Sequence, residues 1–156
     1  MMSQVVEIKK GKPSMKIAIA SDHGGFELKQ KLIEHYAAKG LNLQDLGTHS
    51  TESCDYPLIA RKMTDAILNG ETDLGILICG TGIGISIAAN RVKGIRAALL
   101  YNEDVARLAR QHNNANIAVF GGRMQKFEDV VKYFDAFLNS EFEGGRHQRR
   151  IGELDE

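Results

Sequence analysis

The run Leu74–Cys79, with the sequence LGILIC, constrains the fold of this chain more than any other feature. It contains no charged or amide side chain, and a strand that is apolar at every position is buried on both of its faces. Such strands are typical of parallel sheets that helices cover on both sides. Other strand-length apolar runs are spaced along the chain, so we expect strands at 16–20, 41–46, 74–79, 95–100 and 116–120.

The intervals between these runs carry apolar side chains at helical spacing. The first interval has a stripe made of Leu28, Leu32, Ile33 and Tyr36, and Gly40 is placed to end that helix. Further helices are expected over 57–70, from near 85, after 102, over 125–139 and from 144 onward. This alternation predicts a Rossmann-like three-layer α/β/α sandwich around a parallel sheet of about five strands. In such sheets ligands bind beyond the carboxyl ends of the strands.

The length of 156 residues suits one domain. Residues 1–14 lack the apolar core of a secretory signal. We expect them to be a disordered N-terminal extension. Residues 15–156 are expected to form a single domain that ends in a C-terminal helix or tail. Cys54 and Cys79 lack metal-ligand spacing, so we expect free thiols in a cytoplasmic protein.

Two classes of protein are disfavoured by composition. The 20 basic and 20 acidic side chains give zero formal net charge, whereas a nucleic-acid binder normally carries a basic excess. No apolar run reaches the roughly 20 residues that a membrane helix needs. The sequence therefore predicts neither a nucleic-acid partner nor a membrane partner.

Polar side chains follow the expected strands at the edge where ligands bind. Three strands, the first, the third and the fifth, end directly in such residues, and the fourth strand leads to a histidine through a helix. We expect these side chains to gather on one rim of the sheet, although they are scattered in the sequence. They are Asp22, His23, Cys79, Thr81, His112 and Arg123.

The segment CGTGIG at 79–84 follows the third expected strand and precedes a helix. Its three glycines let backbone N–H groups turn toward a ligand at a helix N-terminus, where negative charge is favoured. A dinucleotide site is the rival interpretation, but its fingerprint is G-x-G-x-x-G with an acidic residue ending the next strand. This chain has G-x-G-x-G, and its next strand ends in Leu100 and Tyr101. The spacing therefore speaks against a dinucleotide.

Cys79 and two of the histidines each have two interpretations. A lone cysteine at a strand end is often a buried small hydrophobe. A glycine loop and a helix N-terminus beside it instead favour the thiolate, which can serve as a base. His23 and His112 can be structural, or they can bind a ligand at the rim. The sequence assigns no role to His35, His49 and Cys54.

Arginines crowd the C-terminal end of the chain. Arg146 and Arg150 are four residues apart, so on a helix both guanidinium groups project from the same face. Guanidinium groups bind phosphate through bidentate hydrogen bonds, and such a pair suits a small anion. The alternative is a solvated basic tail without a ligand.

Six segments together resemble ribose-5-phosphate isomerase type B, in a superfamily that also includes the subunits of galactose-6-phosphate isomerase. They are SDHGGF at 21–26, DYP at 55–57, ICGTGIGISIAAN at 78–90, RQHNNAN at 110–116, FGGR at 120–123 and GGRHQRR at 144–150. The resemblance extends from residue 15 to residue 151. It implies an aldose–ketose isomerase of the non-oxidative pentose phosphate pathway, which interconverts D-ribose 5-phosphate and D-ribulose 5-phosphate through an enediolate.

The resemblance also implies a role for each matching residue. Cys79 would move the proton between C1 and C2 of the sugar, and His112 would open the furanose ring. The enediolate would be held by Thr81 and by the loop amides, with Gly80, Gly82 and Gly84 forming the loop. Sugar contacts are implied for Asp22, which would also relay hydroxyl protons, and for Tyr56, Ser86 and Asn113. Phosphate contacts are implied for His23, Arg123, Arg146, His147 and Arg150.

Relatives that use a glutamate as base carry it where this chain has Ile85, so the resemblance is to the cysteine subtype. Enolisation needs a base and oxyanion donors, and neither a cofactor nor a metal is expected. Allose 6-phosphate, galactose 6-phosphate and a non-catalytic phosphosugar-binding module are the alternatives. The resemblance implies a homodimer, or a dimer of dimers, with sites at the subunit interface. An isologous contact would join the same rim of two subunits, and the partner would supply His112 and Arg123.

Overall fold

The computed structural model of the protein describes residues 15–156, and the extension expected at 1–14 lies outside the described residues. A five-stranded parallel sheet has the order β2-β1-β3-β5-β4. The strands are β1 (Ile17–Ser21), β2 (Gln44–Asp45), β3 (Leu74–Cys79), β4 (Ala97–Leu99) and β5 (Ile117–Gly121). The two edge strands, β2 and β4, are shorter than the apolar runs that predicted them, because fewer of their residues pair with a neighbour.

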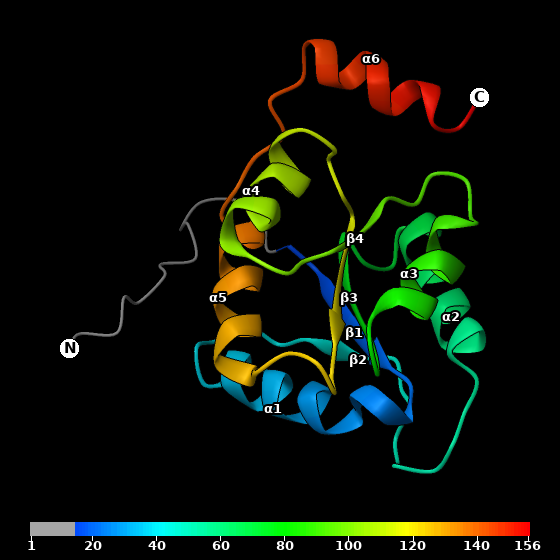
Figure 1. Ribbon diagram of the computed structural model, residues 1–156, viewed down its shortest axis with the longest axis vertical. Coiled ribbons are helices and arrows are strands. Elements are labelled where there is room, and N and C mark those ends of the chain that lie inside the picture. The colour runs from blue at the N-terminus through cyan, green and yellow to red at the C-terminus, as the bar shows by residue number, and fades with distance from the viewer. Residues whose placement is uncertain (1–14) are drawn as a thin grey trace, which may run out of the picture.

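Helices cover both faces of the sheet, which confirms the expected three-layer sandwich (Figure 1). One face packs against α1 (Phe26–Ala37), α4 (Glu103–Gln111) and α5 (Phe127–Leu138). The other face packs against α2 (Tyr56–Leu68) and α3 (Ile83–Asn90). A short 3-10 turn, η1 (His23–Gly25), precedes α1. Within residues 15–156, no helix combines the length and the apolar character needed to cross a membrane.

Local sequence signals account for the ends of these elements. Every position of β1, β3 and β5 is buried, as their continuous apolar runs predict. Gly40 adopts a φ of +83° just after α1. Asn102 caps α4 by accepting a hydrogen bond from the Val105 amide at 2.8 Å. The third helix begins at Ile83 rather than near 85, because Gly82 is its left-handed N-cap.

The parallel sheet gives the molecule two distinct ends. All five strands start at one end, here called the amino edge, and finish at the other, the carboxyl edge. A helix that joins two parallel strands must run back. Helix α4 therefore starts at the carboxyl edge, after β4, and ends at the amino edge, before β5. The terminal helix α6 (Arg146–Glu153) lies across the amino edge (Figure 1).

A partly buried ion pair supports the carboxyl edge. Lys29 has a fully buried side chain, and its Nζ lies 2.7 Å from Asp45 Oδ2. The other carboxylate oxygen of Asp45 accepts a hydrogen bond from the Gly47 amide at 2.9 Å. The Gly47 carbonyl then accepts from the Ser21 amide at 2.7 Å. The ion pair thus fixes the loop after β2 against the last residue of β1.

Replacing Asp45 by Asn is expected to lower the free energy of unfolding by about 3 kcal/mol, because the Lys29 ammonium loses its counter-charge while it stays buried. The double variant Lys29→Met/Asp45→Asn removes both charges and is expected to recover most of this loss. Urea denaturation followed by circular dichroism measures both changes. Equal losses in the single and double variants would show that the charges are not the cause.

Candidate active site

Three strand ends meet at the carboxyl edge. The Asp22 amide donates to the Ile78 carbonyl at 3.1 Å, and the Gly122 amide donates to the Cys79 carbonyl at 2.8 Å. Strand β1 lies beside β3, and the chain continues from these two strands toward opposite sides of the sheet. Open α/β sheets bind ligands at such a point, so the carboxyl ends of β1 and β3 mark the candidate site.

Cys79 is the last residue of β3, and its side chain is buried. Its Sγ accepts a hydrogen bond from the Gly82 amide at 3.2 Å. Gly82 is the N-cap of α3, so the sulfur lies at the positive end of a helix dipole. The amide and the dipole both place positive partial charge beside the sulfur.

Two glycines allow the loops around Cys79 to pack closely. Gly82 has a φ of +82°, and a Cβ there would lie 2.6 Å from Leu99 Cδ1. A Cβ at Gly121 would lie 2.6 Å from the Thr81 carbonyl oxygen, a distance that real Cβ atoms do not reach. Gly80 differs, because a Cβ there would approach only the Arg123 side chain, at an ordinary 3.4 Å.

Short hydrogen bonds hold the polar side chains at the end of β1. Asp22 is buried, and its Oδ1 accepts from the Gly24 amide at 2.9 Å. The Nδ1 atom of His23 accepts from the Cys54 amide at 3.2 Å. An accepting Nδ1 carries no proton, so the proton of a neutral His23 ring is on Nε2.

The start of α3 and the end of β5 complete this side of the site. Thr81 Oγ1 accepts from the Ile83 amide at 3.2 Å, and Ser86 Oγ donates to the Ile83 carbonyl at 2.8 Å. The Tyr56 ring lies over Gly84, where a Cβ would be 2.8 Å from the ring. The Arg123 amide donates to the Gly80 carbonyl at 3.0 Å. We call these residues the Cys79 group: Asp22, His23, Tyr56, Cys79, Gly80, Thr81, Gly82, Gly84, Ser86 and Arg123.

His112 does not lie on this rim, and the expectation that it would is wrong. It is the C-cap of α4, and the direction of that helix carries it to the amino edge. There its ring stacks on His147 of α6, with ring centroids 4.1 Å apart. Arg146 and Arg150 project from the same helix and are exposed. We call the predicted residues at this end the His112 group: His112, Asn113, Arg146, His147 and Arg150.

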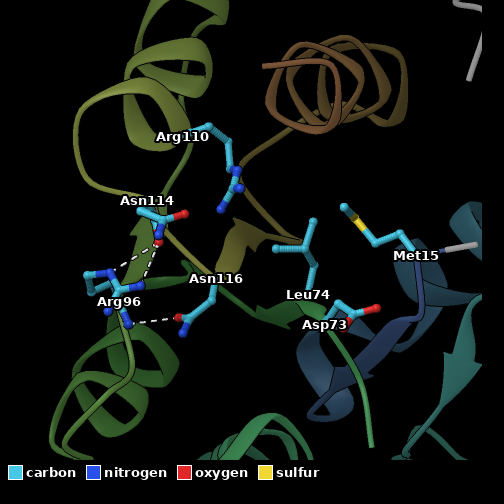
Figure 2. Close-up of a pocket in the computed structure, with 7 residues that line it drawn as sticks. All are labelled: Met15, Asp73, Leu74, Arg96, Arg110, Asn114 and Asn116. Carbon is cyan, nitrogen blue, oxygen red and sulfur yellow. Dashed lines mark hydrogen bonds between the residues drawn. The ribbon is translucent and has the colours of Figure 1, made fainter. Parts of the chain in front are cut away.

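Two arginines hold the turn that follows His112. Arg96 donates to the carbonyl groups of Asn113 and Asn114, each at 2.9 Å, and Figure 2 shows its guanidinium beside Asn114. Arg110 donates to the Ala115 carbonyl at 2.6 Å. Both arginines line a cavity of about 460 Å³ at the amino edge, together with Met15, Asp73, Leu74, Asn114 and Asn116 (Figure 2). This cavity lies at the other end of the sheet from Cys79.

Glu143 is the residue of this end that the sequence analysis missed. Its Oε1 lies 3.6 Å from His112 Nε2 and 3.7 Å from His147 Nε2. It precedes α6 and belongs to no helix, so helical spacing from His147 gives no signal for it. Burial lowers the pKa of His147, the charges of His112, Arg146 and Arg150 act in the same direction, and the Glu143 carboxylate opposes them.

Replacing Gly82 by Ala is expected to destabilise the protein by about 1–3 kcal/mol, because the new methyl group must adopt a positive φ and displace neighbouring atoms. Gly80→Ala is the matched control and is expected to change the free energy of unfolding by less than about 0.5 kcal/mol. Urea denaturation of both variants measures the difference. Equal effects would mean that the close packing around Gly82 does not constrain the loop.

Comparisons with known proteins agree with this architecture. The family model described as Ribose/Galactose Isomerase matches residues 17–154. Ribose-5-phosphate isomerase B of Escherichia coli (strain K12) is 47% identical over 136 residues, which cover 87% of this chain and 91% of that protein. The crystal structure of a ribose 5-phosphate isomerase from Thermotoga maritima is 55% identical and superimposes with a TM-score of 0.89, covering 92% of this chain and 99% of that one.

A solved structure with a ligand is also similar. Ribose-5-phosphate isomerase B from Mycoplasma genitalium, crystallised with bound ribulose-5-phosphate, is 47% identical to this chain. It superimposes with a TM-score of 0.85 and covers 92% of this chain and 95% of its own. The family model, the sequence identities and the superpositions agree over nearly the whole described region. This chain belongs to the ribose/galactose isomerase family.

Proposed function

We propose that this protein is a ribose-5-phosphate isomerase of the B type, which interconverts D-ribose 5-phosphate and D-ribulose 5-phosphate. The observation that supports this proposal most directly is the Cys79 sulfur, which accepts the Gly82 amide at the N-terminus of α3. A base is thereby placed beside backbone donors at the expected ligand position of the fold. Relatives that carry this name, one of them with bound ribulose-5-phosphate, support the same activity.

The reaction transfers one proton between neighbouring carbon atoms. In the open-chain aldose, the Cys79 thiolate removes the proton from C2, and the electron pair forms an enediolate with the C1 carbonyl. The thiol then returns the proton to C1, and C2 becomes the carbonyl of the ketose. Thr81 and the amides of the loop 79–84 stabilise the enediolate, and Asp22 relays the hydroxyl protons. A positioned base contributes about 10²–10⁴-fold to the rate, and one oxyanion donor about 10²–10³-fold.

The remaining members of the Cys79 group hold the substrate. Tyr56 and Ser86 contact the sugar from α2 and α3. His23 and Arg123 bind the phosphate, since His23 offers its Nε2–H and Arg123 a guanidinium that is exposed beside Gly80. The phosphate lies away from the reacting carbons, so these contacts serve mainly binding and orientation.

The His112 group reaches the substrate from a second subunit in this proposal. Within one chain, His112 lies at the amino edge and Cys79 at the carboxyl edge. A homodimer in which the amino edge of each subunit meets the carboxyl edge of the other completes two sites through one two-fold axis. The partner then supplies the histidine that opens the ring, the sugar contact of Asn113, and phosphate ligands from α6. Exposed Ile83 and Ile87 on α3, beside the glycine loop, suit such a contact.

This arrangement revises two expectations about the shared site. Joining the same rim of two subunits would bring together two Cys79 groups and would leave both His112 groups outside. Arg123 was expected with His112, but its amide bonds the Gly80 carbonyl in the same chain, so it belongs with Cys79. The contact must therefore join unlike ends of the two subunits.

We also propose that the enzyme works in the cytoplasm. Cys54 and Cys79 are both free thiols, and Cys79 must remain reduced to act as a base. A reducing compartment maintains that state. A sugar-phosphate substrate of central metabolism fits the same compartment.

Replacing Cys79 by Ala is expected to lower kcat by at least about 10²-fold, because the proton then has no positioned base. Cys54→Ala is the matched control and should retain most of the activity, because its thiol has no role in the mechanism. The rate of ketose phosphate formation is measured with ribose 5-phosphate and with allose 6-phosphate, in the presence of a chelator. It gives the loss of turnover in each variant and the substrate preference of the wild-type enzyme. Near-normal turnover in Cys79→Ala would place the base elsewhere.

Subunit complementation tests the shared site. Inactive Cys79→Ala and His112→Ala chains, mixed in equal amounts and allowed to exchange, should regain about a quarter of wild-type activity. Half of the dimers are then mixed, and each mixed dimer holds one intact site of two. Cys79→Ala mixed with Arg123→Ala is the control and should regain nothing, because both residues belong to the same half-site. Recovery in the control pair, or none in the test pair despite demonstrated exchange, would contradict the arrangement.

A further inference from the structure

Among residues 15–156, a cluster of side chains that could hold a metal ion lies outside the Cys79 group. His112 Nε2, His147 Nε2 and a carboxylate oxygen of Glu143 all lie within 4.8 Å of one another. Imidazole and carboxylate groups are ligands for first-row transition metals, and two histidines with one carboxylate form a common donor set. The proposed reaction uses none of these groups as metal ligands and gives Glu143 no role.

The donor atoms of the three side chains are close neighbours. His112 and His147 stack with ring planes 11° apart, and both Nε2 atoms face the same Glu143 oxygen, at 3.6 and 3.7 Å. The Glu143 backbone is fixed by its amide, which donates to the Gln111 carbonyl at 3.0 Å. The cluster is therefore formed by two segments that are already tied together, the end of α4 and the approach to α6.

The exposure of the cluster suits an ion that enters from solvent. His147 is nearly buried, with 10% of its side chain exposed, whereas His112 and Glu143 expose 37% and 53%. Zinc lies about 2.0–2.2 Å from nitrogen and oxygen ligands, so its ligand atoms are roughly 3.3 Å apart in tetrahedral geometry. Binding therefore requires the exposed His112 and Glu143 side chains to rotate, so that both Nε2 lone pairs turn toward the ion, and water can complete the coordination.

We propose that His112, Glu143 and His147 bind a divalent transition-metal ion such as Zn²⁺, and that this ion inhibits the isomerase. Inhibition follows because a His112 imidazole that coordinates a metal has no lone pair left for proton transfer. This second half rests on the proposed function, in which His112 opens the sugar ring. Metal binding itself rests only on the three side chains.

Binding is tested first, without reference to activity. The Cys79→Ala protein is titrated with Co²⁺ and followed by calorimetry and visible absorption. We expect a stoichiometry of one ion per chain and visible absorption bands typical of Co²⁺ bound by nitrogen and oxygen ligands. Glu143→Gln in the same background should bind at least about tenfold more weakly, the loss typical of even an indirect metal partner. Glu153→Gln, at the other end of α6, is the matched control and should bind normally. Unchanged binding in Glu143→Gln, or no binding in Cys79→Ala, would overturn the site.

Inhibition is tested with the wild-type thiol present. Zn²⁺ should inhibit ribose 5-phosphate isomerisation, a chelator should restore it, and Glu143→Gln should need at least about tenfold more Zn²⁺ for the same fractional inhibition. The rate of each variant with Zn²⁺ is divided by the rate of the same variant without metal. If the metal-free wild-type enzyme does not isomerise ribose 5-phosphate, the proposed function is wrong, and the metal site is not affected by that result. Equal inhibition of Glu143→Gln and Glu153→Gln by Zn²⁺ would overturn the proposal, because Glu143 would then not hold the inhibitory ion. A sulfur-to-cobalt charge-transfer band in the near ultraviolet would also overturn it, because the ion would then be bound by a thiol.

Discussion

The direction of the chain in a parallel sheet decides where the side chains of the proposed active site lie. Strands β1, β3 and β5 all finish at the carboxyl edge, and their ends carry Asp22, Cys79 and Arg123. The helix that joins β4 to β5 must return to the amino edge, and His112 stands at its end. A single chain therefore separates its cysteine from this histidine by the length of the sheet. The fold cannot shorten that separation without reversing a strand.

The carboxyl edge is held together by an ion pair, by glycines and by backbone hydrogen bonds. The Lys29–Asp45 pair fixes the loop after β2 against β1. Glycines remove the side chains that would keep the loops after β3 and β5 apart. Helix α3 then presents its N-terminal amide to the Cys79 sulfur at a fixed distance. The position of Cys79 at this edge is thus set by backbone hydrogen bonds and close backbone packing.

The sequence predicted the layers, the central strands and the cysteine loop, because each of these depends on local periodicity or on residues close together in the chain. The burial of Lys29 was not predictable, since its partner Asp45 belongs to a two-residue strand whose pairing is a tertiary feature. The position of Glu143 depends on the course of the segment between α5 and α6, which has no periodic pattern. The error on His112 was avoidable, because strand–helix alternation already requires a returning helix to end at the amino edge.

In the proposed dimer, each site combines the Cys79 group of one subunit with the His112 group of the other. Its geometry therefore depends on how rigidly each group is held in its own subunit. A base and a ring-opening acid act on one sugar only if both approach it within a fraction of an ångström of the productive distance. The Cys79 group meets that demand through backbone hydrogen bonds across three strand ends. The His112 group meets it through the stack of His112 on His147 and the carbonyl contacts of Arg96. The stack and the arginine contacts, which touch no reacting atom, therefore set the position of the histidine in the proposed dimer as firmly as the subunit contact itself.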